Sequence, residues 1–152
     1  MSHDGCHPHT GGQCYKIVSR HSGKVLDIEG GSYDDGAHVI QYDYNGGENQ
    51  HWRFEQVSHD TYLIISAKSG KALDVPHVSQ DDGVQLQQWT INHGANQSFH
   101  LEPVGDGYCR IRAVHSGKVV DVEGASHDNC QSIIQWDCAD GPNQHWHIEH
   151  VC

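Results

Sequence analysis

Hydrophobic residues alternate with polar ones in short stretches along the chain, and none of these stretches has the three-to-four-residue spacing of a helix. In YKIVSRHSGKVLDIE, residues 15–29, two such stretches flank HSGK, where glycine suits a tight turn because it readily adopts a positive φ. Two more stretches follow within residues 32–57, on either side of the turn sequence NGG. This pattern predicts four short strands joined by turns.

A repeat of 47 residues runs through the chain. The sequence SGK occurs at 22–24, 69–71 and 116–118, so the steps 69 − 22 and 116 − 69 are both 47. The Asn-Gln pairs at 49–50, 96–97 and 143–144 keep the same step. We therefore predict three copies, residues 14–60, 61–107 and 108–152, after a polar His/Gly-rich tail of residues 1–13.

Three copies of four strands predict an all-β chain of about twelve strands. Three units are fewer than the four or more blades of a propeller. Three four-stranded units that close into a barrel with a hairpin cap leave few exposed strand edges. The predicted fold is a β-trefoil of three 47-residue repeats with pseudo-threefold symmetry.

The Asn-Gln-x-aromatic motif is predicted to belong partly to the scaffold. Side chains alternate between the two faces of a strand, so Gln50 and Trp52 share one face while Asn49 takes the other. A large aromatic residue that recurs beside aliphatic positions is typical of a core, and the glutamine can bond to the backbone of a turn. The corresponding pairs are Gln97 with Phe99 and Gln144 with Trp146.

An aspartate, an aromatic residue and an asparagine also recur in every copy. Asp27 lies between Leu26 and Ile28, so alternation predicts that it faces away from the core; the alternative role is a hydrogen bond that stabilises a local turn. A neutral sugar packs its C–H face on an aromatic ring and bonds its hydroxyls to carboxylate and amide groups. The candidate sugar-binding residues are Asp27, Tyr42 and Asn49, then Asp74, Trp89 and Asn96, then Asp121, Trp136 and Asn143.

Composition narrows the possible partners. A net charge of −11 with neutral histidines argues against nucleic acid and anionic membranes, and no apolar run is long enough to insert into a membrane. The N-terminus has no apolar segment of a secretion signal, so we expect a cytoplasmic protein or one released by a non-classical route. Six cysteines are few for a disulfide scaffold, although Cys14 or Cys6 could bridge Cys152 because trefoil termini lie close together.

The motifs QHW, QSF and QHW, each with an upstream SGKxLDV-like segment and an IQW-like strand, resemble the ricin B-chain type lectins over residues 14–152. The resemblance implies a β-trefoil that binds galactose, N-acetylgalactosamine or related glycans without a metal or other cofactor. The alternative within the family is a carbohydrate-binding module for xylan or arabinan. By resemblance, the nine residues above bind sugar, and Gln50, Gln97 and Gln144 support them.

The chain departs from that family in several positions. The family often has a glutamine two residues before the stacking aromatic; only Gln87 matches and is by resemblance a further sugar-binding candidate, since the other copies have Ile40 and Ile134. Pro76 is expected to change the rim of the second site. Cys130 stands where the other copies have glycine and is expected to distort its loop. The cysteine that many secreted members have before the key aspartate is absent, so no bridge within a copy is expected.

Rival functions find less support in the sequence. A glycosidase needs two carboxylates across one bond, whereas each copy offers one such aspartate, and no triad, phosphate loop or HExxH is present. A protein-interaction or protease-inhibitor trefoil would not require the trio in all copies. The tail is expected to be disordered; its alternative role is a weak transition-metal site made by His3, Cys6, His7 and His9.

Overall fold

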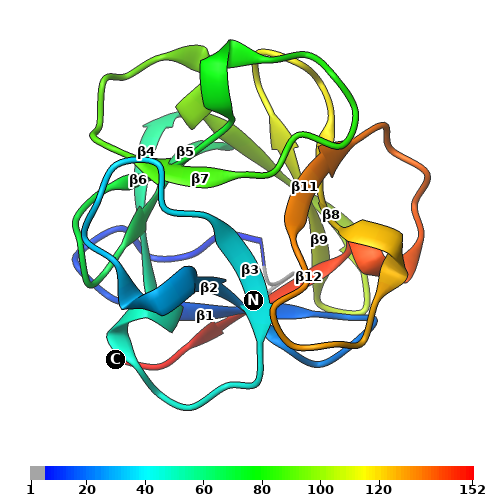
Figure 1. Ribbon diagram of the computed structural model, residues 1–152. Coiled ribbons are helices and arrows are strands. Elements are labelled where there is room, and N and C mark those ends of the chain that lie inside the picture. Colours follow the sequence, from blue (N-terminus) through cyan, green and yellow to red (C-terminus); the bar gives the residue numbers. More distant parts are fainter. Residues whose placement is uncertain (1–5) are drawn as a thin grey trace.

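The computed structural model describes residues 6–152, which contain twelve strands and six short 3-10 turns (Figure 1). The strands are β1 Tyr15–Ser19, β2 Val25–Ile28, β3 Val39–Tyr42, β4 Trp52–Ser58, β5 Thr61–Ser66, β6 Ala72–Asp74, β7 Gln87–Trp89, β8 Phe99–Gly105, β9 Tyr108–Ala113, β10 Val119–Val122, β11 Ile133–Trp136 and β12 Trp146–His150. The 3-10 turns are η1 Glu29–Gly31, η2 Glu48–Gln50, η3 Pro76–Val78, η4 Ala95–Gln97, η5 Glu123–Ala125 and η6 Pro142–Gln144. The predicted four strands per copy are confirmed.

Six of the strands close into a barrel. Antiparallel pairing runs from β1 to β4, β5, β8, β9 and β12, and β12 pairs with β1 again. Because every barrel strand has a neighbour on both sides, this ring leaves no open edge. The pairing of β1 with β12 places the first and the last strand side by side (Figure 1).

Three hairpins, β2–β3, β6–β7 and β10–β11, cover one end of the barrel. Single antiparallel bridges join them in a triangle: His38 to Gln87, Gln85 to Ile134, and Ile40 to Ser132. Each copy therefore contributes two barrel strands and one cap hairpin, which is the architecture of a β-trefoil. Figure 1 shows the resulting three lobes around a common centre.

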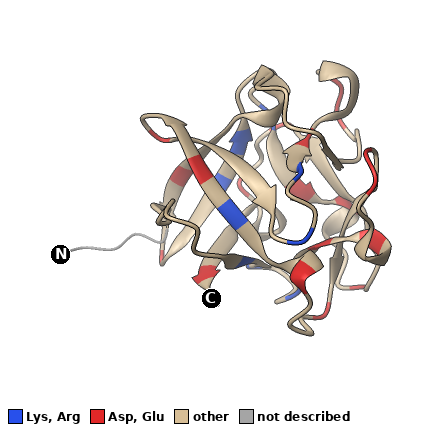
Figure 2. Ribbon diagram, turned by 90° about the vertical axis from the view of Figure 1, so that its left-hand side faces the viewer, with Lys and Arg blue, Asp and Glu red and all other residues tan. Residues whose placement is uncertain are grey.

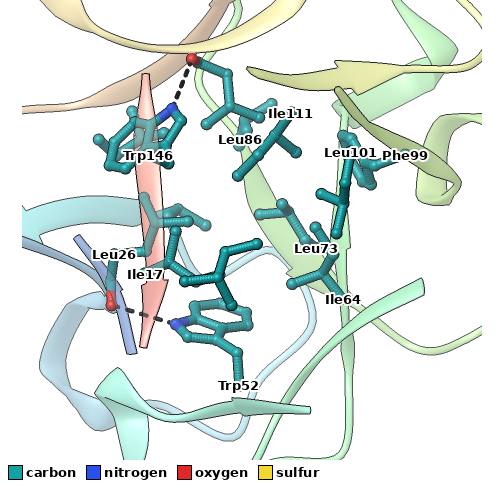
Figure 3. Close-up of a cluster of buried hydrophobic side chains, with 14 of the residues drawn as sticks. Ile17, Leu26, Trp52, Ile64, Leu73, Leu86, Phe99, Leu101, Ile111 and Trp146 are labelled. Carbon is teal, nitrogen blue, oxygen red and sulfur yellow. Dashed lines mark hydrogen bonds between the residues drawn. The ribbon is translucent and has the colours of Figure 1, made fainter. Parts of the chain in front are cut away.

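The aromatic residues of the repeated motif lie at the centre of the core, as predicted. Trp52, Phe99 and Trp146 are fully buried, among aliphatic side chains from all three copies (Figure 3). The indole of Trp52 donates to the carbonyl of Leu26 at 3.2 Å, and that of Trp146 donates to the carbonyl of Val120 at 3.0 Å. These bonds satisfy the polar atom of each buried indole, while the phenyl ring of the middle copy needs none.

A disulfide joins Cys14 to Cys152, so Cys14 is the partner of the two that the sequence offered. The segment before it packs against the domain: Cys6 and Pro8 are buried, and the backbone N–H of His9 donates to the Tyr15 hydroxyl at 2.7 Å. Cys6 and Pro8 of the tail are thus packed against the domain, whereas the whole tail was expected to be disordered; residues 1–5 of it lie outside the described residues. The sequence has 20 acidic and 9 basic residues, and Figure 2 shows both kinds on strands and loops of the domain.

Candidate functional site

Each copy forms one pocket between its cap hairpin and its two 3-10 turns. The first pocket contains Asp27, Tyr42 and Asn49 and measures about 470 Å³. The second contains Asp74, Trp89 and Asn96 in about 290 Å³. The third contains Asp121, Trp136 and Asn143 in about 540 Å³. The structure thus brings together all three predicted trios, each within its own copy.

The aspartates lie at the floor of the pockets and are not open to solvent. The prediction that alternation turns them outward is wrong in this respect, because Asp27, Asp74 and Asp121 are only 5%, 2% and 5% exposed. In the first copy, η2 folds over the strand and carries Asn49 and Gln50 onto the carboxylate. Strand alternation correctly predicts that the aspartate side chain points away from the barrel core, but it does not predict the 3-10 turn that covers the carboxylate.

The glutamine of each motif connects the scaffold to the pocket floor. Gln50 donates to Asp27 Oδ2 and to the Asp43 carbonyl, both at 2.9 Å, and accepts the Asn45 N–H at 2.8 Å. The predicted bonds to turn backbone are confirmed, and the bond to the aspartate is an addition. The equivalent bonds in the other copies run from Gln97 to Asp74 at 2.9 Å and from Gln144 to Asp121 at 2.8 Å.

Burial changes the acidity of two of these carboxyls. Loss of hydration raises the pKa of Asp27 and of Asp121, because the charged form is the one that water stabilises most. Hydrogen bonds from Gln50 and Gln144 act in the opposite direction but are the smaller effect. The floors of the first and third pockets are therefore desolvated acceptors that gain from a further donor such as a hydroxyl group.

The asparagines brace the pockets from the side. Asn49 Nδ2 donates to Asp27 Oδ1 at 3.2 Å and to the Ile28 carbonyl at 3.1 Å. Both amide hydrogens are thus engaged within the protein, whereas the sequence argument assigned them to the sugar. The bond to the strand carbonyl recurs from Asn96 to Val75 at 3.0 Å and from Asn143 to Val122 at 3.3 Å.

The aromatic walls of the pockets are accessible. Trp89 and Trp136 are 39% and 43% exposed, and Tyr42 is half-buried. A loop from the preceding copy backs each ring: a side-chain carbon added to Gly36 would lie 3.8 Å from the Trp89 ring, and one added to Gly83 would lie 3.6 Å from the Trp136 ring. Half-exposed rings held in this way offer a rigid apolar platform.

Cys130 occupies the equivalent position behind Tyr42 and lines the first pocket. The expectation that it distorts its loop is wrong. Its φ is 69°, close to the 88° of Gly36 and the 87° of Gly83, and its N–H donates to the Gln41 carbonyl at 2.9 Å, as the two glycines do to their own partners. Cys130 therefore lines the first pocket without altering the backbone of its loop.

The second pocket differs most from the others. Gln87 Nε2 donates to Asp74 Oδ1 at 3.0 Å, where the first and third pockets have Ile40 and Ile134 in their walls. Asp74 Oδ2 also accepts from Asn96 at 3.3 Å, so this carboxylate carries three donors. Pro76 begins η3, whose next two residues, 77 and 78, form the rim as the sequence predicted.

Three buried glutamines that the sequence argument left without a role tie the copies together. Gln41, Gln88 and Gln135 are at most 1% exposed and recur every 47 residues, since 88 − 41 and 135 − 88 are both 47. Gln41 donates to the carbonyls of Ser126 and Asp128 at 2.9 and 2.8 Å, and the other two make the corresponding bonds to the preceding copy. Their identity in all three copies was the signal that could have revealed them.

Metal ligation finds little support in the described residues. Their one candidate cluster comprises Cys14, His51 and Cys152, and its two cysteines form the disulfide. In the tail, Cys6 is buried and its thiol donates to the Tyr108 carbonyl at 3.6 Å, while the side chains of His7 and His9 are exposed. His3 lies outside the described residues. None of the helical turns in residues 6–152 is long and apolar enough to cross a membrane.

Known proteins share this sequence and structure. The chain is 45% identical to a designed threefold symmetric protein, ThreeFoil, over 91% of this chain and 99% of that one, with a TM-score of 0.90. It is 42% identical to the exo-β-1,3-galactanase 1,3Gal43A of Clostridium thermocellum over 95% of this chain but 31% of that one, also with a TM-score of 0.90. The C-half of an earthworm R-type lectin, in complex with GalNAc, is 25% identical over 91% of this chain and 99% of that one, with a TM-score of 0.73.

A curated relative, the clotting factor G alpha subunit of Tachypleus tridentatus, is 40% identical over 48 residues, which are 32% of this chain and 7% of that subunit. The sequence also matches the family described as ricin-type beta-trefoil lectin domain-like over residues 7–89, 48–136 and 95–151. This is a family of carbohydrate-binding domains and not of enzymes, in agreement with the single aspartate per copy. A match that reaches across the whole trefoil, whose three copies hold the same kind of pocket, makes this chain a member of the ricin-type β-trefoil lectin domain family.

Proposed function

We propose that this carbohydrate-binding domain recognises galactose- or N-acetylgalactosamine-type glycans through three pockets at once. The observation that supports this best is the pairing, in every copy, of a buried carboxylate with an accessible aromatic ring. The ring packs against the C–H face of a pyranose, while the carboxylate accepts its hydroxyl hydrogens. A galactanase at 42% identity and a lectin holding GalNAc at 25% identity support the galactose class.

Three pockets on one rigid body favour multivalent binding. A single open monosaccharide pocket typically has a Kd of about 1 mM, which is roughly −4 kcal/mol. Engagement of two or three sites on one surface raises the apparent affinity by about 10²-fold, since the later binding events become intramolecular. The trefoil supports this by placing one pocket in each lobe, so that a glycan-coated surface or a branched chain can meet more than one (Figure 1).

A glycan array followed by calorimetry with galactose, N-acetylgalactosamine and xylobiose tests the proposal. We expect millimolar binding of the galactosides and agglutination of galactose-bearing cells. The triple variant Tyr42→Ala, Trp89→Ala, Trp136→Ala removes the accessible rings and is expected to abolish both. Preference for xylobiose would support the polysaccharide-module alternative, and binding that survives the triple variant would refute the proposed site.

A further inference from the structure

A lysine from the second copy reaches the first pocket. Lys68 lies in the turn between β5 and β6, and its half-buried side chain lines the pocket together with Asp27, Tyr42 and Asn49. The Lys68 ammonium lies 5.1 Å from the centre of the exposed Tyr33 ring. The first pocket therefore holds a cation, and neither of the other two pockets is lined by a lysine or an arginine.

The equivalent residues of the other copies are used differently. His115 and His21 stand 47 residues after and before Lys68, since 115 − 68 and 68 − 21 are both 47. His115 Nε2 donates to the Ser79 carbonyl at 2.6 Å, and His21 Nε2 donates to the Ala125 carbonyl at 2.7 Å. Both imidazoles are thus bound to backbone, whereas the lysine directs its charge into a pocket.

A glycine makes room for this ammonium. Gly31 ends η1 with a φ of 60°, and a side-chain carbon added there would lie 2.7 Å from Lys68 Nζ and 3.9 Å from Asn49 Cγ. The matching positions are Val78, with φ 53°, and Ala125, with φ 51°, so their side-chain carbons fill the space that the ammonium takes in the first copy. Two differences at two separate positions, Gly31 and Lys68, therefore cooperate to present one charge.

The charge of Lys68 is not neutralised within the described part of the chain. The other four lysines each pair with a carboxylate, at 3.6 Å for Lys16, 3.0 Å for Lys24, 3.9 Å for Lys71 and 2.7 Å for Lys118, whereas Lys68 forms no ion pair among residues 6–152. A half-buried ammonium with no counter-ion, at the rim of a binding pocket, is a site for an anionic group of the ligand.

We propose that the first pocket selects an acidic glycan, with a carboxylate or sulfate group seated over Gly31 against Lys68, and that the second and third pockets take neutral sugars. This inference rests on the proposed galactoside function of the same pocket. Glu29 also borders the pocket, but its side chain is 56% exposed and lies 3.9 Å from His38, so solvent screens it. The third pocket holds the equivalent carboxylates, Asp121 and Glu123, but is lined by no cation, so it lacks the attraction that Lys68 supplies.

The experiment uses the variant Trp89→Ala, Trp136→Ala, which leaves only the first platform, and measures Kd by calorimetry for lactose, sialyllactose and galactose-sulfated lactose. We expect one or both acidic ligands to bind about five- to tenfold more tightly than lactose, as for a partly shielded charge-assisted bond. The advantage shrinks in 0.5 M NaCl because salt screens the pair. A preference for only one of the two acidic ligands identifies whether the group is a carboxylate or a sulfate.

Two changes in that background test the residues themselves. Lys68→His, which copies the other repeats, and Gly31→Ala, which the backbone of Ala125 shows to be compatible with the fold, are each expected to bring the acidic and neutral affinities together. Lys71→Ala, whose ammonium pairs with Asp35 outside the pocket, is the matched control and keeps the difference. Two results would overturn the inference while leaving galactoside binding intact: equal affinities for lactose and the acidic ligands before Lys68 or Gly31 is changed, or a preference for acidic ligands that survives Lys68→His. If neither lactose nor the acidic ligands bind, the inference and the proposed galactoside function are both overturned.

Discussion

Replacing Gln144 by alanine tests whether the motif glutamine of the third copy acts in folding stability, as distinct from sugar binding. Gln144 is 2% exposed and makes four hydrogen bonds. It donates to Asp121 Oδ2 at 2.8 Å and to the Asp137 carbonyl at 3.0 Å, and it accepts the N–H groups of Ala139 at 2.8 Å and Asp140 at 3.0 Å. The alanine variant leaves all four partners without this bond, while the exposed Trp136 ring of the same pocket is retained.

The expected destabilisation follows from the number and kind of these bonds. Three neutral bonds contribute about 1 kcal/mol each and a bond to a carboxylate about 1.5–3 kcal/mol, which sets an upper range of about 4.5–6 kcal/mol. Water entering from the open side of the pocket restores part of this, so we expect a loss of about 3 kcal/mol. That is a large share of the roughly 5–15 kcal/mol that stabilises a domain of this kind.

Trp136→Ala is expected to have the opposite effect to Gln144→Ala, a loss of sugar binding with little loss of folding stability. The indole is 43% exposed, so its removal is expected to cost less than about 1 kcal/mol of folding stability, while sugar binding in the third pocket is lost. Gln56→Ala is the control for the glutamine change, because Gln56 is an exposed strand residue and its loss is expected to change stability by no more than about 0.5 kcal/mol.

Urea denaturation followed by far-UV circular dichroism measures these differences, with calorimetric titration of galactose as the second assay. With a slope of about 2 kcal/mol per molar urea, a 3 kcal/mol loss moves the midpoint by about 1.5 M. Unchanged stability in Gln144→Ala would refute the scaffold role of the motif glutamine. A large destabilisation by Trp136→Ala would refute the assignment of that ring to binding.

Three further outcomes are expected. Because burial raises the pKa of Asp27 and Asp121, acid neutralises these acceptors above pH 3.8, the value of an unperturbed aspartate. Galactose affinity measured between pH 7 and 4 is therefore expected to fall as the pH falls. Without sugar, these two carboxyls bind protons more tightly in the folded state, so their own contribution to folding stability rises as the pH falls through that window. Reduction of the Cys14–Cys152 disulfide, which spans 138 residues, is expected to cost about 2–5 kcal/mol and lower the melting temperature in calorimetry without unfolding the domain at 25 °C. Gln87→Ile, which copies the other pockets, frees one carboxylate oxygen and is expected to raise the affinity of the second site about threefold; an unchanged or weaker affinity would show that Gln87 contacts the sugar.

The fold could be predicted from the sequence because a single repeat period of 47 residues runs through the chain. A step of 47 residues maintained from the SGK turns to the core aromatics requires three equivalent units, and few architectures close three short β units around one core. The aspartate, the aromatic residue and the asparagine were predictable for the same reason. Each lies within its own copy, at the end of a strand or in the turn that follows.

The contacts that Lys68 and Cys130 make with the first pocket were not predictable from that period. Lys68 enters the pocket of the copy before its own, and Cys130 backs the ring of Tyr42 across the cap. Such contacts depend on how the three hairpins meet, which alternation along a strand does not encode. The burial of Asp27 was missed for a related reason, since its cover comes from η2, more than twenty residues further along the chain.

The hydrogen bonds explain which pocket residues are the same in all copies and which differ. Asp27 and its equivalents accept a hydrogen bond from the motif glutamine, and the same glutamine bonds to the backbone of the following loop. A change of the aspartate or the glutamine therefore destabilises the fold as well as the site. The side chain of Lys68 and Gly31 take no part in that network, and the residues at their positions vary between copies. A trefoil built in this way keeps three binding floors alike because its stability requires them, while its rims are free to differ. Multivalency with unequal sites is therefore the expected result of this architecture.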